Sequence, residues 1–173
     1  VFQRTPSSVD IRNNSETDPD WAAGLRPGWQ KERQKKFGEA FLGGPIDPAF
    51  VDDGWTRLTR NVKALAAQAD EKITNLVQLA DFKTMEEIRS RVDEEVKDPK
   101  VADKLKAYYN QFCKRPTFND HYLDTFNRDN VELVDVSTTR GVEAITERGV
   151  VASGKEYEVD CIIYASGFEI TSS

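Results

Sequence analysis

The chain has 173 residues, of which 38% are hydrophobic, 10% aromatic and 31% charged, with a formal net charge of -6 at pH 7. This length suits one domain, or one domain with an insertion, and the aromatic content is sufficient for a core. The acidic balance argues against general nucleic-acid binding, and no apolar run has membrane-spanning length.

The compartment can be inferred from the cysteines and the chain ends. Cys113 and Cys161 stand in unrelated contexts, which does not suggest a disulfide framework, and no signal peptide is recognisable. We therefore expect a cytoplasmic protein. Because the chain opens on VFQRTP and stops after YASGFEITSS, we also expect it to be an internal piece of a longer protein.

The first forty residues combine a strand, a loop and a helix. Residues 1–5 have the pattern of a short strand that ends at Pro6, and the polar residues 7–20 predict a loop. Residues 29–42 carry helix signals that stop at GGP.

The middle of the chain is predicted to be helical. Apolar residues recur at three- and four-residue spacing over 55–69, 73–80, 85–96 and 101–112, which predicts one buried face for each helix. Thr84 and Glu87 form a capping-box pattern, so we expect a helix to start there, and KDPK to end it.

The period changes after Phe112. Residues 119–126 predict a short helix, residues 130–136 and 142–146 predict strands, and residues 149–160 predict a hairpin that turns at Ser153-Gly154. DCIIYASG is apolar at consecutive positions, as in a parallel strand buried on both faces. The strands flank a helical block of roughly ninety residues, far longer than a loop. The predicted fold class is therefore α/β with a largely helical insertion.

Arg4 lies at the carboxyl end of the first predicted strand. In dinucleotide-binding sheets an acid after the second strand holds the 2′-hydroxyl of NAD, whereas an arginine nearby accommodates the 2′-phosphate of NADP. Taken alone, Arg4 is more simply explained as a charge at the end of a strand.

Lys114 and Arg115 stand between a helical pattern and Pro116, where the backbone is held away from helix. They are either a solvated basic pair or an anion site, with lysine on a phosphate and arginine on a developing oxyanion. Asp120 and Asp124 either orient these side chains or are surface acids.

Several other kinds of site have no support in the sequence. His121 is the single histidine and has no cysteine cluster near it, so it is a poor metal ligand, and no nucleophile elbow accompanies it. Neither a P-loop nor GxGxxG occurs in the chain.

The order VFQRTP, helical block, CKRP, YLDTFNRDNVELVD and EVDCIIYASGF resembles the Baeyer–Villiger monooxygenases. These are flavoenzymes that use FAD, NADPH and O2 to convert ketones to esters or lactones through a peroxyflavin. The resemblance implies a Rossmann-like NADPH domain, made of residues 1–14 and 112–168, interrupted by a helical insertion at 15–111. Residues 169–173 would lead to an FAD domain outside this chain.

The resemblance also implies roles for individual residues. Arg4 and Thr5 match positions at the 2′-phosphate and adenosine end of NADP, Lys114 matches a second phosphate contact, and Arg115 matches the catalytic arginine. A further three positions match the ATG that joins the two domains, with serine for threonine: Ala165, Ser166 and Gly167.

The family's two GxGxxG loops and its FxGxxxHxxx signature are not in this sequence, and we expect them before Val1. The piece alone is therefore expected to bind no FAD and to oxidise no ketone. Two alternatives remain open from the sequence: an N-hydroxylating or sulfoxidising flavin monooxygenase, and a non-catalytic interaction or assembly module.

Overall fold

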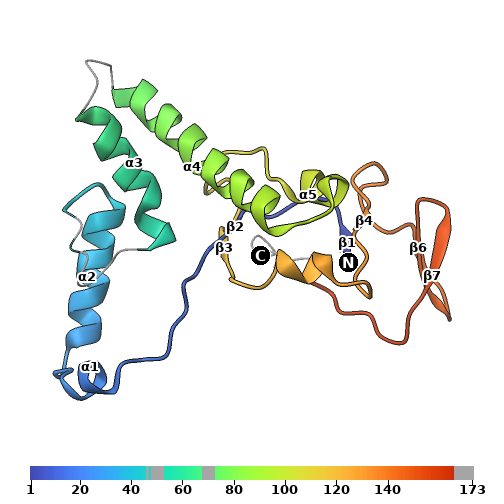
Figure 1. Ribbon diagram of the computed structural model, residues 1–173, viewed down its shortest axis with the longest axis horizontal. Coiled ribbons are helices and arrows are strands. Elements are labelled where there is room, and N and C mark those ends of the chain that lie inside the picture. The colour runs from blue at the N-terminus through green and yellow to red at the C-terminus, as the bar shows by residue number, and fades with distance from the viewer. Residues whose placement is uncertain (46, 48–52, 68–72, 166–173) are drawn as a thin grey trace, which may run out of the picture. The chain divides into compact units, whose positions relative to one another are not determined.

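The computed structural model describes residues 1–45, 47, 53–67 and 73–165 (Figure 1). The chain divides into two compact units. The first unit combines Val1–Thr5 with the chain from Glu132 onward, and the second runs from Pro6 to Val131. The predicted NADPH-domain boundaries concern cofactor binding rather than compactness, and they stay a prediction.

The first unit is built from short strands. β1 (Phe2–Gln3) pairs in parallel with β4 (Val134–Asp135), and β5 (Ala144–Ile145), β6 (Gly149–Ala152) and β7 (Lys155–Glu158) form an antiparallel sheet. Its core contains Val134, Val136 and Ala152, and Phe2 and Tyr157 pack against these residues. The Phe2 and Tyr157 rings meet edge to face, with 5.3 Å between their centroids.

The predicted hairpin is confirmed. Ser153 and Gly154 connect β6 to β7 with φ angles of 52° and 73°, the left-handed backbone that a two-residue hairpin turn requires. Glycine adopts this conformation without strain, and the hairpin therefore turns where the sequence places Gly154.

The second unit contains all the described helices. They are α1 (Pro19–Ala23), α2 (Trp29–Phe41), η1 (Gly54–Thr56), α3 (Arg57–Ala66), α4 (Ile73–Glu95), α5 (Pro99–Leu105) and η2 (Asp124–Asn127). The predicted helix that stops at GGP is confirmed as α2. Asp98 starts α5 by accepting a hydrogen bond from the Lys100 N–H at 2.8 Å, with Pro99 at its first position. Among the residues that the structure describes, no helix is both long and apolar enough to cross a bilayer.

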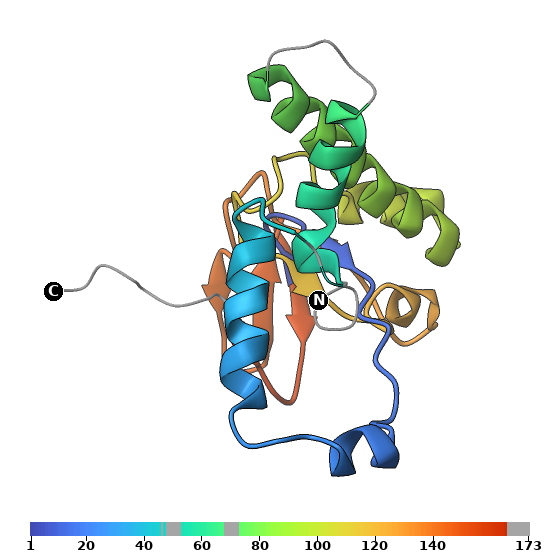
Figure 2. The same ribbon diagram turned by 90° about the vertical axis from the view of Figure 1, so that its left-hand side faces the viewer.

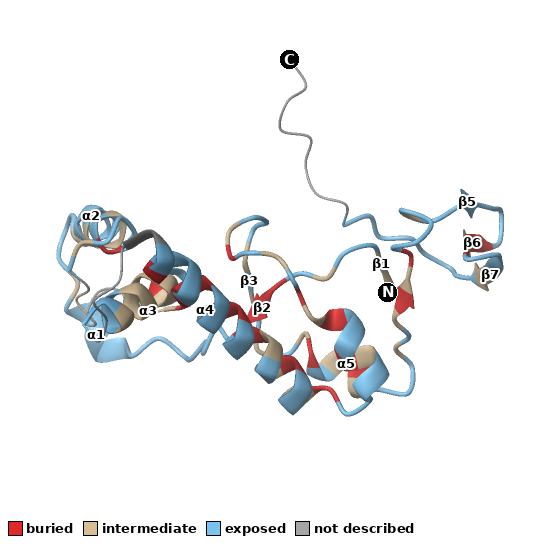
Figure 3. Ribbon diagram, turned by 90° about the horizontal axis from the view of Figure 1, so that it is seen from above, coloured by how far each residue is buried: buried red, intermediate tan, exposed pale blue. Residues whose placement is uncertain are grey.

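Helices α3 and α4 lie side by side and pack against each other (Figure 2). Most of the predicted apolar face is buried along α4, whose other face is exposed (Figure 3), but Val77 was predicted on the buried face and is 46% exposed. The buried apolar residues of α4 are Leu76, Ala80, Met85, Ile88 and Val92. The buried face predicted over 55–69 is wrong, because Trp55 is exposed and α3 has no buried residue among those described.

The prediction that a helix starts at Thr84 is wrong, because α4 continues through this position. The Thr84 hydroxyl donates to the Ala80 carbonyl oxygen at 2.8 Å and accepts from the Asn61 side-chain amide of α3, also at 2.8 Å. Its capping capacity is thus used inside the helix pair, in the back-bonding that threonine can make to the preceding turn.

A parallel pair of two-residue strands joins the two ends of the helical block. β2 (Val9–Asp10) pairs with β3 (Thr117–Phe118), although residues 7–20 were predicted to be a loop. The buried Asp10 carboxylate accepts from the Ile11 N–H at 2.7 Å and pairs with the Arg57 guanidinium at 3.0 Å. That ion pair ties the start of α3 to the strand pair.

Three other predictions differ from the structure. The helix predicted to reach Phe112 ends at Leu105, and Tyr108 is 71% exposed. The short helix predicted over 119–126 is reduced to η2, because the Asn119 side chain accepts the backbone N–H groups of His121 and Tyr122.

The third difference concerns the segment that begins at Asp160. Residues 160–167 were predicted to be a buried strand, but residues 160–165 form none and are exposed, with Ile163 at 87%, and residues 166 and 167 lie outside the described residues. A strand buried on both faces needs paired neighbours on both sides, and no described strand pairs with this segment.

Gly54 is predicted to tolerate no larger residue. A Cβ atom there would lie 2.2 Å from the Phe118 ring and 2.9 Å from the Asp10 carboxylate, whereas a Cβ at Gly38 of α2 meets nothing within 4 Å. We expect Gly54→Ala to lower the free energy of unfolding by about 1–3 kcal/mol through overpacking. Gly38→Ala should raise it by roughly 0.5–1 kcal/mol through helix propensity. Urea titration of both variants checks the pair, and equal effects at the two sites would contradict this prediction.

Candidate functional site

Lys114 and Arg115 lie on a turn of the chain, residues 111–116, between α5 and β3. Both side chains are exposed, and none of the ion pairs found in the described part of the chain involves either of them. Two neighbouring cations without a carboxylate partner are free to bind an anion. Because Pro116 restricts the backbone next to them, the turn presents them in a defined conformation.

Phe112 fixes the start of this turn. Its φ angle of 66° is left-handed, a conformation that costs a residue with a Cβ atom about 1–2 kcal/mol. Its ring stacks on the Trp55 ring, with 6.1 Å between the centroids and an interplanar angle of 16°. The Phe41 ring meets it edge to face at 5.6 Å. These ring contacts offset the strain. The sequence had placed Phe112 on a helix, and the backbone conformation explains why the helical pattern fails there.

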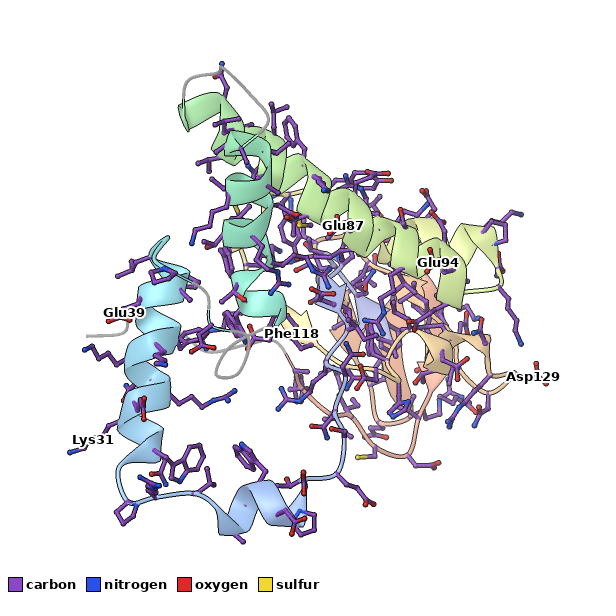
Figure 4. The ribbon with its side chains drawn as sticks, turned by 60° about the vertical axis from the view of Figure 1, so that its left-hand side comes forward. Lys31, Glu39, Glu87, Glu94, Phe118 and Asp129 are labelled. Atoms are coloured by element: carbon purple, nitrogen blue, oxygen red, sulfur yellow. The ribbon has the colours of Figure 1, made fainter. Side chains whose placement is uncertain are left out.

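The other anchors of the turn come from β3 and α4. Phe118, labelled in Figure 4 near the start of α3, lies 5.1 Å from the Trp55 ring. At the start of the turn, the Gln111 N–H donates to the Asp81 carboxylate of α4 at 2.8 Å. Burial raises the pKa of Asp81, while the Gln111 N–H and the charge of Arg89 oppose that rise. The basic pair is thus held between two fixed points.

The ammonium of Lys114 lies over the Tyr109 ring, 5.5 Å from its centroid. This distance is within the range in which an aromatic face attracts a cation. Sequence reasoning did not single out Tyr109. Its only signal was its position at the end of an apolar stripe, where the neighbouring Tyr108 had been assigned to the core.

The remaining predicted site residues belong to the first unit. Arg4 and Thr5 directly follow β1 and are exposed, as expected for residues at the carboxyl end of a strand. Ala165 is exposed and lies outside any strand, while Ser166 and Gly167 lie outside the described residues. Of the predicted site residues, Lys114 and Arg115 therefore lie together on one turn, and Arg4, Thr5 and Ala165 belong to the other unit.

The two nearby acids have other partners than the basic pair. The Asp120 carboxylate accepts three backbone N–H groups, from Arg12 at 2.8 Å, Asn13 at 3.0 Å and Asn14 at 3.1 Å. Asp124 accepts from the Asn127 side chain at 3.0 Å. Asp120 and Asp124 were expected either to orient Lys114 and Arg115 or to be surface acids. Their contacts do not orient the basic pair, and Asp120 instead holds the loop after β2.

The described residues contain no group of three histidine, cysteine, aspartate or glutamate side chains arranged to hold a metal ion. The chemistry available at the turn is that of a lysine and an arginine. They can bind a phosphate and stabilise negative charge on oxygen.

The fold is shared with solved ketone monooxygenases. A polycyclic ketone monooxygenase from Thermothelomyces thermophila matches 92% of this chain and 27% of its own, with a TM-score of 0.73 and 34% identity. OTEMO, in a structure with FAD and NADP, matches 97% of this chain and 33% of its own, with a TM-score of 0.67 and 25% identity. These matches confirm the predicted α/β fold class and show that the chain has the fold of one segment of a ketone monooxygenase.

Sequence comparison gives the family. A Baeyer–Villiger monooxygenase from Stachybotrys chlorohalonatus is 53% identical over 98% of this chain, and Baeyer–Villiger monooxygenase 4 from a Dietzia species is 45% identical over 99% of it. Neopentalenolactone D synthase from Streptomyces avermitilis is 56% identical over 98%. No family model matches the chain. The chain belongs to the Baeyer–Villiger monooxygenase family, and it spans less than a third of these relatives, 28% and 29% of their lengths.

The Asp120 contacts predict an acid-sensitive loop. The pKa of this carboxyl is lowered, chiefly by the Asn14, Arg12 and Asn13 N–H groups. Its stabilising contribution is therefore present above the unfolded pKa of about 3.9 and is lost as pH falls through the lower folded value. We expect Asp120→Asn to be less stable at pH 7 and to show less loss of stability between about pH 5 and 2. Thermal unfolding across this range measures it, with exposed Asp129→Asn as the control. A parallel pH profile for Asp120→Asn and wild type would contradict it.

Proposed function

We propose that this chain is a segment of a longer flavin-dependent monooxygenase that uses NADPH and O2 to oxidise ketones to esters or lactones. The observation that carries the proposal is the exposed Lys114-Arg115 pair on an anchored turn, in a chain 45–56% identical to monooxygenases and a lactone synthase. The relatives are more than three times as long, which supports an FAD domain elsewhere in the same protein. The partners would be a small ketone and O2, without nucleic acid or membrane.

The cationic residues fit the phosphate groups of NADPH. Lys114 has a compact charge suited to a phosphate, and Arg4 follows β1 as an NADP-selective arginine would. Thr5 has a hydroxyl next to Arg4 that can donate to the same end of the cofactor. Ala165, Ser166 and Gly167 are proposed to lead the chain towards the FAD domain, as the family resemblance implies.

Arg115 is proposed as the catalytic residue. Bound NADPH would supply the hydride and FAD would activate oxygen, so the protein must bind both and stabilise the charge that develops. When the ketone carbonyl is attacked, negative charge develops on its oxygen, and a fixed guanidinium can donate two parallel hydrogen bonds to such a centre. A preorganised donor of this kind is worth about 3–4 kcal/mol of barrier lowering. The anchored turn provides that preorganisation.

Ketone oxidation is favoured over the other two functions considered. Three of the relatives, which are 43–53% identical to this chain, are named Baeyer–Villiger monooxygenases. A purely structural module would not need two exposed cations at a strained turn. The exposed and free Cys113 and Cys161 thiols suit a reducing compartment, which supports the cytoplasm as the site of action.

Cofactor preference tests the two phosphate contacts. In the full-length protein, we expect Lys114→Ala and Arg4→Ala to weaken NADPH binding roughly ten- to a hundred-fold, because each removes a charge-assisted contact. NADH lacks the 2′-phosphate, so its affinity should change little. Titration of both cofactors gives the ratio, with Lys31→Ala on the exposed face of α2 as the control. A wild-type NADPH/NADH ratio in both variants would show that neither residue contacts the 2′-phosphate.

The coupling of NADPH consumption to ester formation tests Arg115. We expect Arg115→Ala to consume NADPH but to form little ester, with hydrogen peroxide released instead, because the developing oxyanion loses its counter-charge. Arg115→Lys should rescue poorly, since an ammonium cannot span two oxygens as the planar fork does. The measurement is ester formed per NADPH consumed. If Arg115→Ala kept the wild-type yield, CKRP would be a solvated surface pair.

A further inference from the structure

Tyr109 contacts three separate parts of the second unit. Its ring packs against the buried cluster of Met85, Ile88 and Ala107. Its hydroxyl donates to the Pro6 carbonyl oxygen at 3.1 Å and accepts the Ser8 N–H at 3.0 Å. The ring also lies under the Lys114 ammonium, 5.5 Å from the centroid. One side chain therefore joins α4, the segment before β2 and the basic turn.

These contacts fix the ring before Lys114 approaches it. A tyrosine has two rotatable side-chain bonds, and packing on one side together with two hydrogen bonds at its tip leaves it one orientation. Lysine has four rotatable bonds and loses much side-chain entropy when it is held in one place. An aromatic face of fixed orientation reduces that loss in advance, because the ammonium is attracted to the negative face of the ring.

We propose that Tyr109 is a positioning residue for Lys114, which holds the ammonium where it meets the 2′-phosphate of NADPH. The inference rests on the proposed function, in which Lys114 contacts that phosphate. It assigns to Tyr109 part of the preference for NADPH over NADH, without any contact between Tyr109 and the cofactor. The contribution of the ring to this preference depends on the negative electrostatic potential of its face, whereas the hydroxyl contributes to the stability of the fold.

The neighbouring Tyr108 provides a matched control. It is 71% exposed and also has a cation over its ring, the Arg89 guanidinium at 5.1 Å. Arg89 is held independently, by Glu86 at 2.6 Å and by the Ala107 carbonyl oxygen at 3.1 Å. Changes to the Tyr108 ring therefore alter a cation–ring contact in the same segment without releasing Lys114.

The experiment compares two rings of the same shape at position 109 of the full-length protein. Tyr109→Phe keeps the aromatic face, and 3,4,5-trifluorophenylalanine at the same position removes most of the negative electrostatic potential of that face. Relative to phenylalanine, we expect the fluorinated ring to weaken NADPH binding roughly two- to five-fold, the size of an exposed cation–ring contact. The affinity for NADH and the melting temperature should stay at the values of Tyr109→Phe. The same pair of rings at position 108 should leave both affinities unchanged.

A Lys114→Ala background separates the positioning role of Tyr109 from the phosphate contact of Lys114. If Lys114→Ala lowers the NADPH/NADH ratio and fluorination at 109 has no further effect in that background, the positioning role is supported. If Lys114→Ala lowers the ratio but fluorination in the wild-type background does not, or if it weakens both cofactors equally, the Tyr109 role is wrong while the phosphate contact stands. If Lys114→Ala leaves the ratio unchanged, the phosphate contact itself is refuted.

Discussion

The Arg91 guanidinium holds together the two ends of the helical block. It donates to the Val9 carbonyl oxygen at 3.2 Å and to the Asn119 carbonyl oxygen at 3.0 Å, while Glu95 receives its Nε–H at 2.6 Å. Val9 belongs to β2 and Asn119 directly follows β3, so one side chain of α4 reaches both members of the parallel pair. A pair of two-residue strands would be marginal alone, and it depends on this cross-link and on the buried Asp10–Arg57 ion pair. The position of the basic turn follows from that closure, since the turn runs directly into β3.

The turn combines a rigid backbone with solvated charges. Phe112 precedes Lys114 and Arg115 in the sequence and Phe118 follows them, and the ring contacts of both hold the turn. The strain lies in the left-handed backbone of Phe112 and not in the charged side chains. Exposed cations carry no desolvation cost, so the protein can leave them without partners until an anion binds. This division of roles provides preorganisation at a low cost in stability.

The sequence predicted the elements whose signals are local. The α2 stop at GGP, the buried face of α4 and the Ser153-Gly154 turn each depend on residues within a few positions of one another. β2 could not be predicted, because two residues in a polar loop become a strand only through a partner far along the chain. The capping pattern at Thr84 misled because its hydroxyl has an equally good acceptor inside a helix.

Predictions for the site divide in the same way. The family resemblance identified Lys114 and Arg115, and Pro116 indicated their exposed turn. Nothing local distinguished Tyr109 from Tyr108, because adjacent tyrosines differ only in which one the backbone turns inward after Leu105. Likewise, an acid that binds three backbone amides has the same sequence signature as a surface acid, so the role of Asp120 required the fold.

The β2–β3 pair also determines the order in which the chain can fold. Its strands lie about a hundred residues apart, and closing a loop of that length costs conformational entropy that two strand residues on each side cannot offset. The α3–α4 hairpin needs only neighbouring residues, so it can form first and bring Arg91 into place. The strand pair then closes late, and the basic turn becomes ordered last. A folding intermediate of this protein would therefore contain its helices and lack its site.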